Sequence, residues 1–422
     1  MKKFFSVFMT VVFALSAVAC LPASAYSHTE YDSEYNGFWI SNPTDYSVKI
    51  VDYTGDETDI VIPDEIYGQK VTAIGRMAFW HNENITSVKL PSCLEEIEES
   101  AFNSCVNLTE IEIPKSLKKC NAPFNGSGIV TATIEDGATE IPDDLFCGCK
   151  KLENVSIPDT VTKIGDNVFT GCSALEELKL PSNLTTLMGA FTGCSDLKSI
   201  TIPKSLNHVV NSPFSWSGLE SAVLEDGMTT VPDELFYCAD KLTDVVIPET
   251  VTTINRHAFS HCSSLETISL PSNLKILGNS VFRNCRSLNS ITIPNTLESI
   301  GDTAFEYCTS LRTITIPASV TSMGNGIFIN IGENFVVSCY RGSVAYDYAL
   351  KNNIKFDVIK EYKSGDVNLD GTVNVSDATL LQKYIADIET LSDEQSKVSD
   401  VNGDGTISVY DVTEIQKIAV SS

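Results

Sequence analysis

A repeat of 23 residues constrains this chain more than any other feature of its sequence. One copy begins at Leu288, and the next begins 23 residues later at Leu311. The same frame is marked by Ile-Pro or Leu-Pro steps, whose prolines fall at positions 91, 114, 158, 181, 203, 248, 271, 294 and 317. Two gaps in this series are double, and each contains a copy with Glu-Asp-Gly in place of the proline, at residues 135–137 and 225–227. These two variants lie 90 residues apart, which indicates that a block of four repeats was duplicated.

Each copy reads as one coil of a solenoid. The pattern Leu-x-x-Ile-x-Ile alternates as a short strand with one buried face does. Proline ends the strand because it cannot donate a ladder hydrogen bond. An Ala-Phe pair then fills the interior from a turn or short helix. One coil cannot bury its apolar face alone, so about twelve stacked coils are expected, which predicts a mostly β-solenoid fold with short strands plus turns or short helices.

The repeat resembles the BspA-type leucine-rich repeat of bacterial surface proteins. The resemblance covers roughly residues 45–358 and includes the end motif Ser343-Val-Ala345-Tyr-Asp-Tyr-Ala349. It implies an N-terminal cap at 26–59 and repeats with a C-terminal cap at 60–358. Such repeats resemble adhesion and protein-binding surfaces more than enzymes, so an unknown protein or surface component is the expected ligand.

Seven cysteines each lie three residues after the phenylalanine of a repeat: Cys105, Cys149, Cys172, Cys194, Cys262, Cys285 and Cys308. An even number of cysteines in an exported chain usually indicates disulfides. One cysteine per coil at one position instead predicts a ladder of buried, reduced thiols that act as small apolar side chains. No second cysteine pair stands at the spacing of a zinc site.

The first 25 residues have the pattern of a secretory signal peptide. Lys2 and Lys3 precede an apolar run from Phe4 to Ala19, and Ala23-Ser24-Ala25 supplies a cleavage site. A lipidated Cys20 is the alternative. No later apolar run is long enough to span a membrane. The chain is therefore expected to be secreted and extracellular, and its net charge of −26 disfavours nucleic acid and anionic lipid as partners.

The sequence contains few residues in catalytic patterns. His257 and His261 have metal-compatible spacing, but the residues between them are the core motif of the repeat and no glutamate fits an H-E-x-x-H site. No nucleophile elbow, phosphate loop or dinucleotide fingerprint occurs. The chain is expected not to be an enzyme. A glycan or protein hydrolase with an unrecognised active site in the repeats remains the alternative, because a pair of carboxylates could serve.

Aromatic side chains are missing from the outward positions of the repeat strands, which disfavours a sugar-binding platform there. The exposed aromatic candidates lie near the phenylalanine turn, at Trp80, Trp216, Tyr237 and Tyr307. They are compatible with a patch on the opposite side of the solenoid or with scattered surface packing.

The last sixty residues contain two oxygen-rich loops in one register, 34 residues apart. Calcium prefers oxygen ligands from loop positions 1, 3, 5, 7, 9 and 12, with glycine at position 6 for the sharp turn. The first loop supplies Asp366, Asn368, Asp370, Thr372, Asn374 and Asp377. The second supplies Asp400, Asn402, Asp404, Thr406, Ser408 and Asp411. Each loop is followed by a helical pattern, so two Ca²⁺ ions are predicted.

These paired loops resemble a type I dockerin over residues 365–422, with the domain itself at 366–422 after a linker at 359–365. The resemblance implies two half EF-hands without entering helices, which dock in a calcium-dependent manner onto a cohesin module of a scaffoldin in a cellulosome-type complex. The contacts carried over from the family are Val375, Ser376, Gln382 and Lys383 in the first copy, and Val409, Tyr410, Gln416 and Lys417 in the second. Val and Gln-Lys recur in both copies, whereas Ser376 differs from Tyr410, so docking in one or in two orientations stays open.

Together these observations predict a non-catalytic secreted component of a polysaccharide-degrading complex. Its dockerin would attach it to a scaffoldin, and its solenoid would bind a protein or surface ligand. A purely structural spacer is a further alternative.

Overall fold

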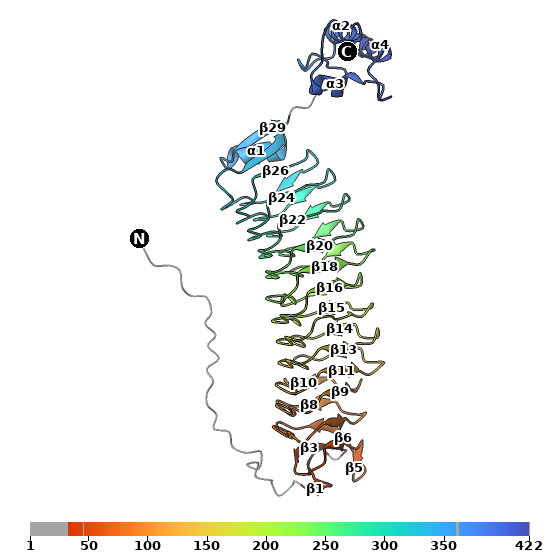
Figure 1. The fold of residues 1–422 in the computed structure, drawn as a ribbon, viewed down its shortest axis with the longest axis vertical. Helices are drawn as coiled ribbons and strands as arrows, with labels where there is room; N and C mark the ends of the chain where they lie inside the picture. The colour runs from red at the N-terminus through yellow and green to blue at the C-terminus, as the bar shows by residue number, and fades with distance from the viewer. Residues whose placement is uncertain (1–32, 45, 360–362, 422) are drawn as a thin grey trace, which may run out of the picture. The chain divides into compact units, whose positions relative to one another are not determined.

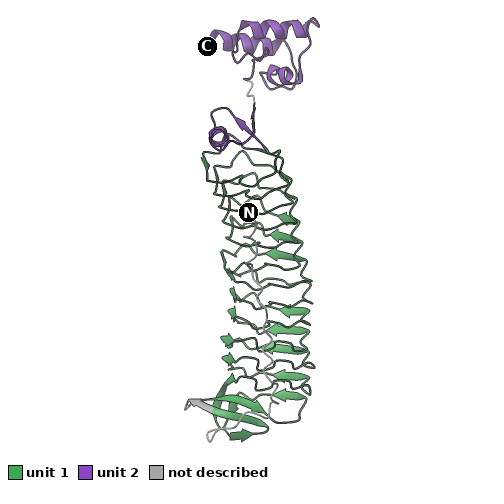
Figure 2. Cartoon of the chain, turned by 90° about the vertical axis from the view of Figure 1, so that its left-hand side faces the viewer, with its two compact units in different colours: residues 1–314, 319–335 green, residues 315–318, 336–422 purple. Residues whose placement is uncertain are grey.

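The computed structural model describes residues 33–44, 46–359 and 363–421. The chain divides into two compact units, residues 1–314 with 319–335, and residues 315–318 with 336–422 (Figure 2). The signal peptide predicted at 1–25 and the alternative lipidation site at Cys20 lie outside the described residues.

The first unit begins with an antiparallel cap. Its strands β1 (Ser33–Tyr35), β2 (Phe38–Thr44) and β3 (Ser47–Tyr53) pair in order. β3 then pairs in parallel with β6 (Gln69–Ile74), which also carries the short antiparallel β5 (Glu65–Ile66). This parallel pairing continues the cap into the coils, so the end of the solenoid is covered by a hairpin instead of an open edge.

The coils stack into a β-solenoid, as predicted (Figure 1). One side is formed by the Leu-x-x-Ile-x-Ile strands: β4 (Asp59–Val61), β7 (Ser87–Lys89), β9 (Glu110–Ile113), β11 (Thr131–Ile134), β13 (Asn154–Ser156), β16 (Ser199–Ile202), β18 (Ser221–Leu224), β20 (Asp244–Val246), β22 (Thr267–Ile268), β24 (Ser290–Ile291) and β26 (Thr313–Thr315). Their paired neighbours run parallel and in register, and burial alternates along them.

A second parallel ladder, which the sequence reading did not specify, follows the proline step of each coil. It contains β8 (Glu96–Ile97), β10 (Lys119–Cys120), β12 (Glu140–Ile141), β14 (Lys163–Ile164), β15 (Thr186–Leu187), β17 (His208–Val209), β19 (Thr230–Val231), β21 (Thr253–Ile254), β23 (Ile276–Leu277), β25 (Ser299–Ile300) and β27 (Ser322–Met323). The ladder is interrupted between β10 and β12 and between β17 and β19, directly before the strand that follows each Glu-Asp-Gly copy. The Ala-Phe motif forms hydrogen-bonded turns, and among the described residues of the repeats before Val344 there is no α-helix.

A column of aromatic rings fills the interior. Its members are Phe79, Phe102, Phe124, Phe146, Phe169, Phe191, Phe214, Phe236, Phe259, Phe282, Phe305 and Phe328. Successive rings stack with centroids 4.7 to 6.2 Å apart. Because each ring contacts the ring before and after it, one coil supplies the apolar surface that its neighbours need.

The seven repeat cysteines are buried and free, so the predicted thiol ladder is confirmed. Each thiol donates to the main-chain carbonyl oxygen of the column phenylalanine one coil earlier, at Sγ–O distances of 3.0 to 3.3 Å. Burial raises the pKa of Cys105 and of Cys308 to about 12. The thiols therefore remain protonated and serve as short cross-coil donors.

In the second unit, β28 (Val336–Tyr340) pairs in parallel with β29 (Phe356–Ile359). The helix α1 (Val344–Lys351) connects them, with Ser343 as its N-cap. The same unit contains the helices α2 (Val375–Ile385), α3 (Asp393–Ser399) and α4 (Val409–Ser421). None of the helices in the described part of the chain has the length and apolar character needed to cross a membrane.

Candidate calcium-binding and docking domain

The first loop is folded around its own aspartates. Asp366 accepts hydrogen bonds from the amides of Asp370, at 3.1 Å, and Gly371, at 2.8 Å. Gly371 takes a φ of 92°, which favours glycine over residues with a Cβ. Asp377 closes the loop, because its two oxygens accept from the amides of Asn368, at 2.9 Å, and Asn374, at 2.8 Å. One side chain thus ties the loop's beginning to its end.

The second loop repeats this geometry. Asp400 accepts from the amides of Asp404, at 3.2 Å, and Gly405, at 2.9 Å. Asp411 accepts from the amides of Val401, at 2.8 Å, and Asn402, at 3.2 Å, through Oδ1. Its Oδ2 accepts from the Ser408 amide at 2.9 Å. Two sequences that differ at several positions therefore fold into one loop form.

The predicted middle ligands also occupy equivalent places in the two loops. Asp370 accepts from the Thr372 amide at 2.9 Å and from its hydroxyl at 2.6 Å, and Asp404 does the same with Thr406. The Thr372 and Thr406 hydroxyls hold the pKa of Asp370 and of Asp404 below the usual range. Both carboxylates are therefore ionised at neutral pH.

The closing aspartates are buried, and no basic side chain in residues 363–421 forms an ion pair with them. Asp377 and Asp411 are 0% exposed and Asp366 is 2% exposed. Within residues 363–421, the lysine ion pairs join Lys383 to Glu389 and Lys417 to Glu414, and none involves a loop aspartate. A buried carboxylate is costly unless it is paired or coordinates a metal.

The donor set fits Ca²⁺, which takes carboxylate, amide and main-chain oxygens together. In the described part of the chain no three His, Cys, Asp or Glu side chains form a preassembled metal cluster. The fit therefore rests on the mixed oxygen donors of each loop and on its unneutralised, buried carboxylates. Asp366, Asn368, Asp370 and Asp377 would hold one ion, with Thr372 and Asn374, and the matching residues of the second loop would hold another.

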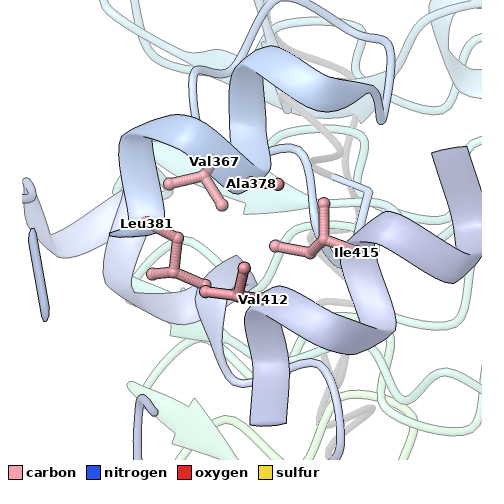
Figure 3. Close-up of a cluster of buried hydrophobic side chains, with 5 residues drawn as sticks. All are labelled: Val367, Ala378, Leu381, Val412 and Ile415. Atoms are coloured by element: carbon pink, nitrogen blue, oxygen red, sulfur yellow. The ribbon is translucent and has the colours of Figure 1, made fainter. Parts of the chain in front are cut away.

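The domain's hydrophobic core is small. It consists of Val367 from the first loop, Ala378 and Leu381 from α2, and Val412 and Ile415 from α4 (Figure 3). A core of this size rarely provides more than about 3–5 kcal/mol, and small domains commonly add metals or disulfides. Bound ions are therefore expected to contribute a large part of the domain's stability.

The helix α3 was not expected from the sequence, which suggested half EF-hands without entering helices. It ends at Ser399, directly before the second loop. Its signal was present as a capping box, because the Ser392 hydroxyl accepts from the Gln395 amide at 3.2 Å and the Gln395 side chain accepts from the Ser392 amide at 2.9 Å. The first loop is preceded by Gly365 and not by a helix. The Gly365 amide donates to the Val398 carbonyl, near the end of α3, at 2.7 Å.

The residues expected to contact a cohesin are all exposed: Val375, Ser376, Gln382, Lys383, Val409, Tyr410, Gln416 and Lys417. Val375 and Val409 begin α2 and α4 and are 66% and 60% exposed, and Tyr410 is 71% exposed. Exposed apolar side chains at both helix starts are the anchors that a docking surface needs.

The sequence profile described as BspA type leucine rich repeat region matches in six copies, over residues 57–123, 121–243 and 229–355. The profile described as dockerin type I domain, a calcium-binding domain, matches residues 364–418. No curated protein matches the chain.

Two solved structures of leucine-rich repeat proteins are similar to this chain. A leucine-rich repeat protein from Bacteroides ovatus is 26% identical, with a TM-score of 0.50, over 78% of this chain and 100% of that one. A leucine rich cell surface protein from Faecalibacterium prausnitzii is 24% identical, with a TM-score of 0.38, over 79% of this chain and 100% of that one. The chain belongs to the BspA-type leucine-rich repeat family, and its residues 364–418 form a type I dockerin domain.

Proposed function

We propose that the chain is an exported, non-catalytic component of a cellulosome-type polysaccharide-degrading complex. Its dockerin holds two Ca²⁺ ions and docks onto a cohesin module of a scaffoldin. The observation that carries this proposal is the pair of loops in one register, each closed by a fully buried aspartate, within the segment that matches a dockerin. The leucine-rich solenoid is the binding module that this attachment brings into the complex.

The cohesin surface is proposed to comprise the starts of α2 and α4. Val375 with Gln382 and Lys383, and Val409 with Gln416 and Lys417, are exposed on equivalent helices. The equivalence supports docking through either helix. Tyr410 against Ser376 gives the α4 surface more apolar area, which favours α4 as the tighter of the two.

A pull-down from the culture of the native organism tests this function. Residues 26–422 serve as bait in Ca²⁺ and again in EDTA, and the Asp366→Ala/Asp400→Ala double variant serves as the matched control. Cohesin-bearing proteins recovered only by the unmodified bait in Ca²⁺ are the expected result. Their absence from that sample would reduce the domain to a structural calcium module.

A hydrolase within the repeats is the second candidate, favoured only by the many carboxylates of the array. Turnover of glycans or peptides by the purified chain, lost on a single Asp or Glu substitution in the repeats, would establish it. We expect no turnover on either substrate panel.

A further inference from the structure

The duplicated block gives two copies of one scaffold with different surfaces. Phe124, Phe146 and Phe169 in the first block correspond to Phe214, Phe236 and Phe259, each 90 residues later, and all six rings are 0% exposed. Because the interior is the same, a difference between the blocks on the turn side is not required by the fold.

The position two residues after each phenylalanine is left-handed in both blocks. In the first block glycines occupy it, at Gly126, Gly148 and Gly171, with φ of 68°, 77° and 74°. The second block places Trp216, Cys238 and His261 there, with φ of 53°, 57° and 66°. A left-handed conformation costs a residue with a Cβ about 1–2 kcal/mol, a cost that glycine avoids.

Trp216 is the largest of these replacements. Its side chain is 67% exposed, and no stacked or edge-on aromatic partner is found for it in the described part of the chain. Its backbone is held by the next coil, because its amide donates to the Cys238 carbonyl at 3.0 Å and Ser215 Oγ donates to the Tyr237 carbonyl at 2.8 Å. Neither packing nor backbone preference accounts for tryptophan at this position.

The following coils add imidazole and guanidinium groups. The Tyr237 ring lies 5.9 Å from the His257 ring and 5.4 Å from the His261 ring, between centroids. His261 Nε2 lies 3.3 Å from the Asn284 side-chain nitrogen, and Asn284 Oδ1 in turn accepts from Arg286 at 3.5 Å. Arg283, on the same coil as Arg286, pairs with Glu306 at 2.6 Å. The first block has Cys147 in place of Tyr237, Asn167 in place of His257 and Gly171 in place of His261. It has Thr192 in place of Arg283, Gly193 in place of Asn284 and Ser195 in place of Arg286.

This surface is unusual for an acidic chain. Arg283 and Arg286 bring two guanidinium groups to it, although the chain carries a net charge of −26. Arg256 pairs with Glu234 and Arg283 with Glu306, whereas exposed Arg286 has no carboxylate partner among the described residues. Burial lowers the pKa of His257 and His261, so at neutral pH the positive charge resides on the arginines.

We propose that Trp216, Tyr237, His261, Arg283 and Arg286, here called the turn patch, bind a carboxylate-bearing polysaccharide. This rests on the proposed role of the solenoid as the binding module. The exposed indole offers a flat apolar face to a sugar ring, and a guanidinium recognises a carboxylate with two parallel hydrogen bonds. Coils repeat about every 4.8 Å along the array, so an extended chain laid across them meets the indole and then the two arginines three coils on.

The test measures the affinity of residues 26–422 for polygalacturonate by isothermal titration calorimetry, with Ca²⁺ present. The first block supplies the substitutions. We expect Trp216→Gly and Arg286→Ser each to weaken binding about tenfold or more, the loss that follows when one strong contact is removed. Lys150→Asp, which introduces into the first block the residue of the second, is the matched control and leaves the affinity unchanged. Affinity should also fall as salt rises, because the charged groups are exposed.

Three outcomes would overturn the proposal. They are no binding of polygalacturonate, equal binding of its methyl ester, and equal binding of polyglutamate that is insensitive to Trp216→Gly. The last would indicate an acidic protein as the partner. Misfolding does not confound the test, because glycine is the unstrained residue at position 216 and a thermal melt reports any loss. Failure would leave the cohesin pull-down unaffected, and other partners that survive EDTA there would still support the solenoid as a binding module.

Discussion

Replacing Asp411 with asparagine isolates the closing position of the second loop. The side chain is fully buried, and its oxygens accept from three backbone amides and from the Ser408 hydroxyl, at 3.3 Å. Asparagine keeps the shape but exchanges one acceptor for a donor, so at least the Ser408 amide or the Val401 amide loses its partner. Hydrogen bonds to charged groups contribute about 1.5–3 kcal/mol, which sets the loss expected without metal.

The calcium contribution of that loop is lost in addition. At a free Ca²⁺ concentration 100 times the dissociation constant, a bound ion stabilises a folded domain by about 2.7 kcal/mol. Asp377→Asn makes the same change in the first loop and is the matched comparison.

Hydrogen exchange measured by mass spectrometry in Ca²⁺ and in EGTA localises the effect. In the unmodified chain we expect chelation to abolish protection in α2 and α4 while the repeat strands stay protected. In the Asp411→Asn variant, α4 should exchange rapidly even with Ca²⁺ present. If α4 of the variant kept full calcium-dependent protection, the role assigned to Asp411 would be wrong.

Three further perturbations test the array. In Gly218→Ala the added Cβ would meet the Ser195 carbonyl oxygen, so we expect a loss of about 1–3 kcal/mol in a denaturant melt of the array, and an unchanged midpoint would contradict this contact. Iodoacetamide at pH 8 should modify Cys105 and Cys308 far more slowly than Cys147, because burial raises the pKa of all three thiols but leaves only Cys147 partly accessible, and equal rates by peptide mapping would refute the ladder. Because burial lowers the pKa of His257 below its unfolded value of about 6.5, the folded state resists protonation and stability should fall as pH drops from above 6.5 through the folded pKa. His257→Asn should flatten that dependence in melts between pH 7.5 and pH 5, and an equally steep profile would exclude His257 as its source.

The repeat period predicted the fold because each coil uses the same few residues for the same purpose. Leucine and isoleucine at alternating positions form the strand, and the phenylalanine forms the inner column. The structure inferred for one copy therefore applies to the others. The second, two-residue ladder was not predicted because a strand of two residues is too short to show alternation. It is formed by the stack, since β14 exists only through its pairing with β12 and β15.

The calcium loops could be predicted from the sequence because the ligand positions are set within one loop of twelve residues. The helix α3 was not predicted because its signal, the capping box of Ser392 and Gln395, lies outside that pattern. The turn patch could not be located from the sequence, which predicted Trp216 and Tyr237 to be exposed. Trp216 is exposed, whereas Tyr237 is half-buried. Its members come from four coils, and only the stack brings His261 of one coil to Asn284 of the next, beside Arg286.

Internal duplication separates what the fold requires from what a ligand would require. Where copies agree, as Asp377 agrees with Asp411 and Phe146 with Phe236, the shared residue is fully buried in both places. Where copies on one scaffold differ, as Gly126 differs from Trp216, the scaffold accepts either residue and the difference needs another cause. Trp216 adds backbone strain and leaves two thirds of its large apolar side chain exposed. Ser376 and Tyr410 differ in the same way, at equivalent helix starts on one pair of matched loops. The two positions at which copies diverge toward an exposed aromatic ring therefore coincide with the two surfaces proposed to bind, one for the sugar polymer and one for the cohesin.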